Sequence, residues 1–173
     1  MRVKSASLTA IMTATACLSL AGCATRPSSA PPASMDTAAV MVQSATAMLG
    51  QPYRFGGAAP GGFDCSGLVI FAARSAGIHL PRTVKDQLRA GVPIARRELA
   101  PGDLVFMHLD RKELHVGIAL GAGRFIHAPA SGGRVRIDSL AAPPYSTGFM
   151  SARRVIGFER RTADPWVDLA ILA

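Results

Sequence analysis

The chain has 173 residues, with 19 Lys or Arg against 11 Asp or Glu, and a formal net charge of +8 at pH 7. Without its first 35 residues it has the length of one domain, too short for two but sufficient for a core without disulfides. The basic balance suits a carboxylate-rich polymer, anionic lipid or simple solubility, and does not decide among them. No interleaving of basic and aromatic residues indicates nucleic acid, and we expect none as a partner.

The N-terminus carries the pattern of a bacterial lipoprotein signal. Arg2 and Lys4 precede an uncharged apolar stretch over 8–20, which is shorter than the roughly 20 apolar residues of a membrane span. This stretch ends in the run Leu20-Ala21-Gly22-Cys23, which resembles the lipobox cut by signal peptidase before the cysteine. The alternatives are an ordinary secretory signal with a chance cysteine, or a short buried helix. We expect residues 1–22 to be a signal peptide that is removed.

Lipidation of Cys23 would anchor the mature protein to a membrane. Two or more acyl chains, palmitate among them, give stable anchoring. Ala24 stands where an Asp would favour retention at the inner membrane, so the outer membrane is preferred, with the domain on the periplasmic side. Residues 23–35 are then the lipidated cysteine and a flexible Pro/Ser/Ala-rich tether, which reaches at most about 40 Å.

Residues 36–160 are expected to form the folded domain, with helices first and strands after them. Helices are predicted over 36–49, 65–76 and 84–90, the first two capped by Asp36 and Asp64, and a loop is predicted over 51–63. Strands are predicted over 104–107, 115–120, 124–128, 134–137 and 153–156. This order indicates an α+β domain in which N-terminal helices pack on an antiparallel sheet. No role is predicted for the C-terminal tail, 161–173.

The cysteine count singles out Cys65. Of the three cysteines, Cys17 leaves with the signal and Cys23 is acylated, so Cys65 has no partner for a disulfide. An unpaired thiol in an exported protein is expected to be reactive, the alternative being a small buried side chain. Cys65 begins a predicted helix, where unpaired N–H groups and the helix dipole lower the pKa of a thiol. This position predicts a nucleophile.

Two of the four histidines are coupled by a predicted hairpin. A turn with an odd number of residues, over 121–123, places His115 and His127 on the same face of the sheet. Gly117 and Ala119 share that face, and because they are small we expect the helix of Cys65 to pack there. The arrangement predicts that Cys65 attacks, His115 takes or holds its proton, and His127 hydrogen-bonds His115 and fixes its tautomer.

A metal site is the alternative role for the two histidines. It would need His108 or Asp110 as a further ligand, but no spacing matches a metal-ligand signature and Cys65 would have no role. We therefore predict no metal and no cofactor. His79 and His108 are expected to be surface histidines.

Six short runs follow one another in a fixed order between about residues 40 and 158. They are Tyr53-Arg54-Phe55-Gly56-Gly57, Phe63-Asp64-Cys65-Ser66-Gly67-Leu68-Val69, Leu80-Pro81-Arg82-Thr83, Pro101-Gly102-Asp103-Leu104-Val105-Phe106, His115-Val116-Gly117-Ile118 and Arg124-Phe125-Ile126-His127-Ala128. Together they resemble the NlpC family of cell-wall cysteine endopeptidases, over nearly the whole mature domain. Three features depart from the family pattern: Ala119 in place of an aromatic residue, Ser146 in place of a Trp, and the tail beyond Phe158.

The resemblance implies a papain-like α+β fold and cleavage of peptide bonds that involve D-amino acids in peptidoglycan. By matching position, Cys65 is the nucleophile, His115 the base and His127 the third polar residue. Tyr53 would hold its hydroxyl near the oxyanion, beside the N–H of Cys65, or else pack as a loop aromatic.

Two further residues are implied to line the cleft. Asp64 and Ser66 contact the substrate's amine in some members of the family, and Asp64 also suits a helix cap. The two roles of Asp64 are compatible.

The sequence thus predicts a lipid-anchored, cysteine-type peptidoglycan endopeptidase that remodels the cell wall. The bond stays open between the D-Ala–diaminopimelate cross-link and D-Glu–diaminopimelate within one stem. One rival is a non-catalytic wall-binding or scaffold lipoprotein on the same fold, and another is an enzyme that transfers acyl groups or hydrolyses amides of a different polymer. Peptidoglycan and the anchoring membrane are the expected partners; regulators and oligomeric state are not predicted.

Overall fold

The computed structural model describes residues 33–109, 113–130 and 133–157, with side chains from Thr37 onward. The signal peptide, Cys23, most of the tether, Asp110 and the tail 161–173 lie outside the described residues, and what was expected of them stays a prediction. Within the described residues, no helix combines the length and the hydropathy that a membrane span requires.

The described residues form four α-helices, where the sequence patterns predict three. They are α1 (Ala33–Thr46), α2 (Cys65–Ser75), α3 (Val84–Gln87) and α4 (Tyr145–Gly148), with a 3-10 turn at Arg96–Glu98. Helix α1 begins three residues before Asp36, so the prediction of Asp36 as its cap is wrong. The cap of α2 is confirmed, because the Asp64 carboxylate accepts the N–H of Gly67 at 2.7 Å.

The strands form one antiparallel sheet of six, in the order β3-β8-β4-β5-β6-β7. Their bounds are β3 Val92–Ile94, β4 Leu104–Leu109, β5 Glu113–Gly121, β6 Arg124–His127, β7 Arg136–Ser139 and β8 Phe149–Arg154. The α+β prediction is confirmed. A second, two-stranded sheet pairs β1 (Ala58–Ala59) with β2 (Gly62–Phe63), inside the segment predicted as loop. That prediction overlooked a hairpin of two very short strands, whose turn is formed by Pro60 and Gly61.

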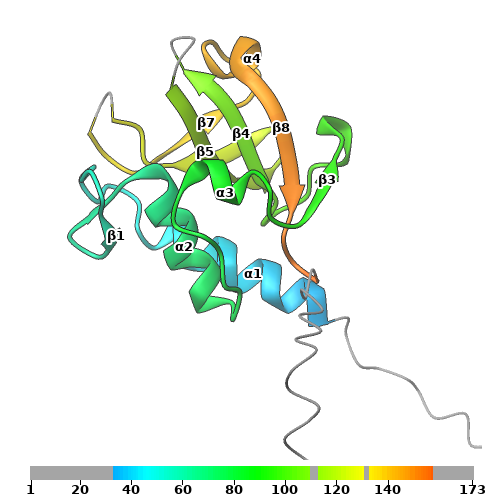
Figure 1. Cartoon of the computed structure of the whole chain (residues 1–173), viewed down its shortest axis with the longest axis horizontal. Coiled ribbons are helices and arrows are strands. Elements are labelled where there is room, and N and C mark those ends of the chain that lie inside the picture. Colours follow the sequence, from blue (N-terminus) through cyan, green and yellow to red (C-terminus); the bar gives the residue numbers. More distant parts are fainter. Residues whose placement is uncertain (1–32, 110–112, 131–132, 158–173) are drawn as a thin grey trace, which may run out of the picture. The chain divides into compact units, whose positions relative to one another are not determined.

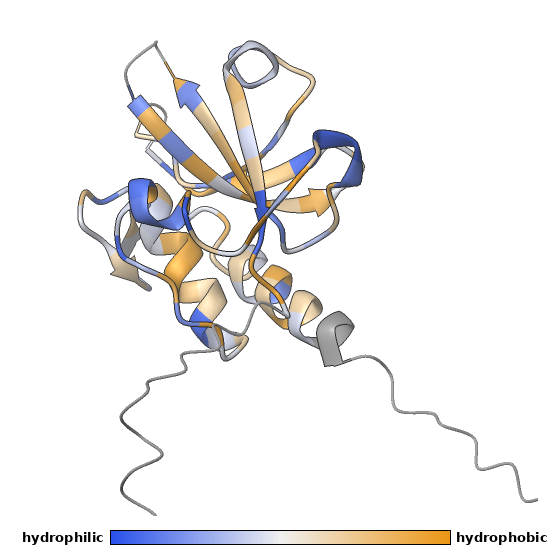
Figure 2. Ribbon diagram, turned by 45° about the vertical axis from the view of Figure 1, so that its right-hand side comes forward, coloured by the Kyte–Doolittle hydropathy of each residue, from blue (hydrophilic) through white to orange (hydrophobic). Residues whose placement is uncertain are grey.

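The large sheet separates two groups of buried side chains. One face packs on α1 and α2 and carries the larger core, which includes Leu104, Phe106, Val116, Ile118, Ile126, Met41, Leu68 and Val69. The other face carries a smaller cluster around α4, made of Val105, Met107, Ala119, Phe125, Leu140 and Tyr145. Figure 1 shows α1 and α2 on one side of the sheet and α4 at its far end, and in Figure 2 the hydrophobic colours gather on α1, α2 and the strands.

The β5–β6 hairpin brings its two histidines onto one face, as predicted. The turn at Ala122–Gly123 follows a register shift between Ala119 and Gly121, which leaves one residue unpaired and preserves the parity of an odd loop. The pairing Ile118–Ile126 then sets Gly117 opposite His127. Directly opposite residues share a face, so both histidines lie on the same side.

That side is the face turned away from α2, so the expected reason for the small residues is wrong. Helix α2 packs on the face of Val116 and Ile118. A Cβ on Gly117 would lie 2.7 Å from the ring of Phe125 and 3.2 Å from the Cβ of His127. The glycine therefore makes room for side chains of β6, and not for the helix that carries the thiol.

Candidate active site

Cys65 sits at the first turn of α2, at the edge of β5. The ladder between β5 and β6 runs from Ile118–Ile126 toward the turn. Val116 precedes this ladder on β5, and its backbone N–H points at the Cys65 sulfur. The N–H of Ser66 points at the same sulfur. Because the N–H groups of a strand lie in the plane of the sheet, the thiol enters beside β5. The thiol therefore lies beside the backbone of Val116, the residue that follows His115, although α2 itself packs on the opposite face.

The pKa of the Cys65 thiol is raised above its ordinary value, against the expectation from the sequence. Burial is the largest cause, and the carboxylates of Asp64 and Glu113 add to it. The N–H groups of Val116 and Ser66 act in the opposite, predicted direction but are outweighed. A helix N-terminus lowers the pKa of a thiol, whereas burial raises it, and here the effect of burial is the larger one. In the free protein the thiol is therefore neutral.

The two histidines form a buried pair in direct contact. Nε2 of His115 and Nδ1 of His127 lie 2.7 Å apart, and the two side chains belong to residues that are 1% and 0% exposed. Burial lowers the pKa of His115 to about 3, with further contributions from His127 and Arg136. Burial also lowers the pKa of His127 to about 4. Both rings are neutral near pH 7, and Nδ1 of His115 is the ring nitrogen that remains for the thiol.

The polar chain continues to a carboxylate that the sequence analysis overlooked. Nε2 of His127 lies 2.9 Å from Oδ2 of Asp138 on β7. The hydroxyl of Tyr145 and Nε of Arg136 donate to the same oxygen at 2.7 and 2.8 Å. Burial acts to raise the pKa of Asp138, but these three donors lower it to about 2. The predicted strand 134–137 ended one residue before Asp138; the alternation of Arg136 and Asp138 on one face was the available signal.

Aromatic rings hold His127 on two sides. The ring centroid of Phe125 lies 4.6 Å from that of His127, and the ring of Tyr145 meets it edge-on at 5.3 Å. Such contacts restrict rotation of the imidazole about its χ angles. The third residue of the site is thus fixed by packing as well as by hydrogen bonds.

Asp64 and Ser66 lie at the start of α2, as predicted, but their polar atoms are occupied. Arg82 donates to both oxygens of Asp64, at 3.0 and 2.5 Å, and to the hydroxyl of Ser66 at 2.8 Å. Gly56 and Gly67 donate their N–H groups to the same carboxylate. Burial opposes ionisation of Asp64, but these donors lower its pKa below the ordinary value. Arg82 lay in a motif of the sequence without an assigned role, and here it organises this side of the site.

Tyr53 is half-buried and lies within electrostatic reach of the thiol. Its pKa is raised by burial and then by electrostatic repulsion from Cys65 in its thiolate form and from the carboxylates of Asp64 and Glu113. Its hydroxyl therefore stays protonated at neutral pH and can donate a hydrogen bond.

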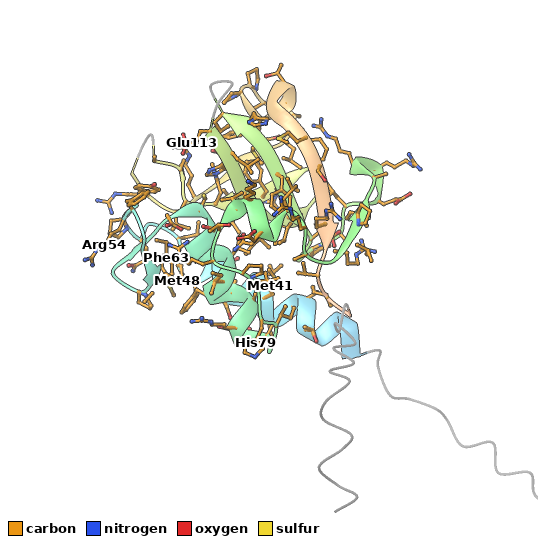
Figure 3. All side chains as sticks on the ribbon, in the orientation of Figure 1. Met41, Met48, Arg54, Phe63, His79 and Glu113 are labelled. Atoms are coloured by element: carbon orange, nitrogen blue, oxygen red, sulfur yellow. The ribbon has the colours of Figure 1, made fainter. Side chains whose placement is uncertain are left out.

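The other histidines lie elsewhere. His108 is adjacent to Met107, which pairs with His115, so it points to the opposite face of the sheet and is exposed. His79 is exposed beyond the end of α2 (Figure 3). In the described parts of the chain no group of three or more His, Cys, Asp or Glu could hold a metal ion.

Known proteins share this arrangement of sequence and fold. The family model described as NlpC/P60 family matches residues 50–154. "Probable endopeptidase NlpC" of Escherichia coli is 37% identical over 145 residues, which is 80% of this chain and 94% of that protein. The murein DD-endopeptidase MepH of Escherichia coli is 42% identical over 62% of this chain and 42% of its own length. The gamma-DL-glutamyl hydrolase of Bacillus subtilis is 38% identical over 83% of this chain and 35% of its own.

A solved structure agrees. The crystal structure of an NlpC/P60 family protein from Bacillus cereus aligns with a TM-score of 0.65 and 34% identity, over 69% of this chain and 40% of that one. The chain spans between 25% and 46% of the length of the first curated relatives it matches. With a family model that covers more than half of its residues and relatives at this identity, the chain belongs to the NlpC/P60 family.

Proposed function

We propose that the chain is a cysteine-type peptidoglycan endopeptidase. The observation that carries the proposal is the contact of 2.7 Å between His115 and His127, together with the unpaired, half-buried thiol of Cys65 at the backbone N–H of Val116, the residue after His115. A nucleophile, a base and a group that orients the base are the parts of a thiol hydrolase. Relatives named as endopeptidases support the same reaction class.

Acylation begins from a neutral thiol and a neutral imidazole. As the Cys65 sulfur attacks the peptide carbonyl, its proton passes to Nδ1 of His115. The negative charge that develops on the carbonyl oxygen is stabilised by the N–H of Cys65 and the hydroxyl of Tyr53. The proton then passes from His115 to the leaving nitrogen, the C–N bond breaks, and a thioester of Cys65 remains.

In the hydrolysis of the thioester, His115 again acts first as a base and then as an acid, with water as the nucleophile. His115 takes a proton from water, the resulting hydroxide attacks the thioester carbonyl, and the carbon–sulfur bond breaks. The proton on His115 returns to the sulfur, which restores the neutral thiol. No metal or cofactor takes part in the proposed reaction.

The substrate is proposed to be a peptide bond of peptidoglycan next to a D-amino acid. The names of two relatives point to different bonds: a DD-endopeptidase and a gamma-DL-glutamyl hydrolase. We propose that the bond cut involves diaminopimelate, joined either to D-Ala across two stems or to D-Glu within one.

Digestion of purified, cross-linked muropeptide dimers by the full chain tests this proposal, with masses of the products as the readout. Release of intact monomers assigns the cross-link, and truncated stems assign the bond within one stem. Binding of dimers without any product would favour the wall-binding rival, and products from other polymers alone would favour the acyl-transfer or amidase rival.

The place of action is proposed to be the cell envelope. The lipobox at Leu20-Ala21-Gly22-Cys23 supports anchoring through acyl chains on Cys23, and Ala24 supports the outer membrane. Metabolic labelling with an azide-bearing palmitate tests the anchor: wild type should carry the label, and Cys23→Ala should not. Labelling that persists in Cys23→Ala would contradict it.

A further inference from the structure

We propose that Asp138 is a positioning residue that sets the tautomers of both buried histidines and leaves Nδ1 of His115 free to accept the proton of Cys65. Its consequence for catalysis rests on the proposed cysteine-peptidase function. The tautomers themselves belong to the free protein and can be measured without substrate.

The direction of the hydrogen-bonded chain is fixed at its carboxylate end. An ionised carboxylate can only accept hydrogen bonds. Asp138 stays ionised because Arg136 and Tyr145 both donate to its Oδ2, at 2.8 and 2.7 Å. The contact of 2.9 Å between this oxygen and Nε2 of His127 therefore requires a proton on that nitrogen.

A neutral imidazole carries one N–H, and this rule transmits the direction along the chain. With its proton on Nε2, His127 presents a lone pair at Nδ1. The contact of 2.7 Å to this lone pair then requires that Nε2 of His115 be the donor. His115 is left with an unprotonated Nδ1, which is the state that a general base for the thiol needs.

Without the carboxylate, the opposite arrangement becomes available. His127 protonated at Nδ1 would donate to Nε2 of His115, and the proton of His115 would move to Nδ1. That nitrogen could then no longer accept the proton of Cys65. Burial keeps both rings neutral. A doubly protonated imidazole, which would make the choice of tautomer irrelevant, is therefore disfavoured.

The alternative role for Asp138 is purely structural, as the acceptor that pairs with Arg136 on β7 and holds Tyr145 of α4 by a hydrogen bond. The chain offers a matched control for this reading. Asp103 is buried and accepts two hydrogen bonds from Arg154, each of 2.8 Å. This pair also joins separate segments of the fold, but Asp103 contacts neither histidine within the described residues. Asp103→Asn thus removes a comparable carboxylate without touching the proposed relay.

Ring-nitrogen NMR of the full chain, labelled with ¹⁵N-histidine and kept reduced near pH 7, tests the proposal directly. His79→Gln and His108→Gln variants remove the two exposed histidines and so assign the remaining signals. In the wild type we expect the N–H at Nε2 of both His115 and His127. An N–H at Nδ1 of either ring in the wild type overturns the proposal, whether or not any variant folds.

Asp138→Asn sharpens the test, because an amide can either donate to or accept from His127. We expect a mixture of tautomers or a switch to Nδ1–H in this variant, while Asp103→Asn keeps the wild-type pattern. Unchanged tautomers in folded Asp138→Asn would overturn the proposal. If the tautomers are as expected and the wild type cleaves no muropeptide, the proposed function fails and the positioning role stands.

Kinetics separate positioning from folding. A wrong tautomer removes the base and not substrate binding, so Asp138→Asn should lower kcat by about 100-fold or more with KM within about twofold. Asp138→Glu should recover part of kcat. A loss of activity equal to that of Asp103→Asn, or one confined to KM, would contradict a positioning role.

Discussion

The two sides of the site are built in different ways. The α2 side, which carries Asp64, Cys65 and Ser66, is organised by a local cap and by the half-exposed guanidinium of Arg82. The sheet side carries the buried His115 and His127 and the partly buried Asp138, and it depends on the register of three strands. The comparison teaches that the helix start that carries the nucleophile is set by a local cap, whereas the base is placed by long-range strand pairing. Changes on the sheet side should therefore have the larger effects.

The largest effect is expected from removing the base. His115→Ala should lower kcat by about 1,000-fold or more, because the thiol is neutral in the free protein and needs an acceptor for its proton. Muropeptide cleavage rates measure this loss. His108→Ala is the matched control, one strand away on the opposite face, and should retain activity. Similar losses of activity in both variants would mean that substitutions on the sheet lower activity by disturbing the fold, and would contradict the role of His115 as the base.

Gly117→Ala tests whether the glycine makes room for β6. Its new Cβ would lie 2.7 Å from the ring of Phe125 and 2.9 Å from the carbonyl oxygen of Ile126. We expect a loss of about 1–3 kcal/mol in the free energy of unfolding, typical of overpacking, measured by urea denaturation. An unchanged unfolding free energy would show that β6 can shift freely and would contradict the account of a rigid face.

Stability should fall with pH below neutrality because of the buried histidines. Their folded pKa values, about 3 and about 4, lie below the unfolded value of 6.5. The unfolded chain therefore binds more protons between these values, and the stabilisation present above pH 6.5 is lost as pH falls toward 4. Each imidazole contributes up to about 1.4 kcal/mol per pH unit. Urea midpoints from pH 7.5 to 4.5 measure this slope.

His127→Gln provides the comparison for that slope. It removes one of the two titrating rings, so its stability should depend less steeply on pH than that of the wild type. Equal slopes would contradict the assignment of the histidines as the titrating groups. Asp138, with a pKa of about 2, adds its own loss only below about pH 4, as its folded pKa is depressed from the ordinary 3.8.

The smallest effect concerns the reactivity of the thiol in the absence of substrate. Because burial raises the pKa of Cys65, its alkylation by iodoacetamide should keep rising with pH through pH 9, without a plateau near neutrality. Mass spectrometry of the peptide that contains Cys65 follows the reaction. A plateau near pH 6 to 7 would reveal a stable thiolate in the free protein and would contradict a neutral resting pair.

On the α2 side, the helix and its cap could be predicted from the sequence, but the contacts of Arg82 with Asp64 and Ser66 could not. The lone cysteine after an N-cap Asp is a local pattern, and the bounds of α2 differ from the prediction by one residue. The shared face of the histidines was predicted correctly from an odd loop, although the odd parity comes from a two-residue turn plus the unpaired residue between Ala119 and Gly121. The face on which α2 packs was not predicted correctly. The sequence predicts that Gly117 makes room for α2, but the glycine makes room for the side chains of Phe125 and His127.

The alternation of Arg136 and Asp138 could have indicated one face of a strand, but the contact of Asp138 with His127 could not be predicted. Its contact with His127 depends on the β6–β7 register, which pairs His127 with Arg136 and Phe125 with Asp138. No pattern along the chain fixes that register. The net direction of the Cys65 pKa shift was mispredicted because helix position is local, whereas burial depends on the whole fold.

The most direct test of the central claim is a digest of purified sacculi by the wild type and by Cys65→Ala in matched amounts. We expect soluble peptide-containing fragments from the wild type and none from the variant, with both proteins equally folded by circular dichroism. Equal release by the two proteins would contradict the assignment of Cys65 as the nucleophile.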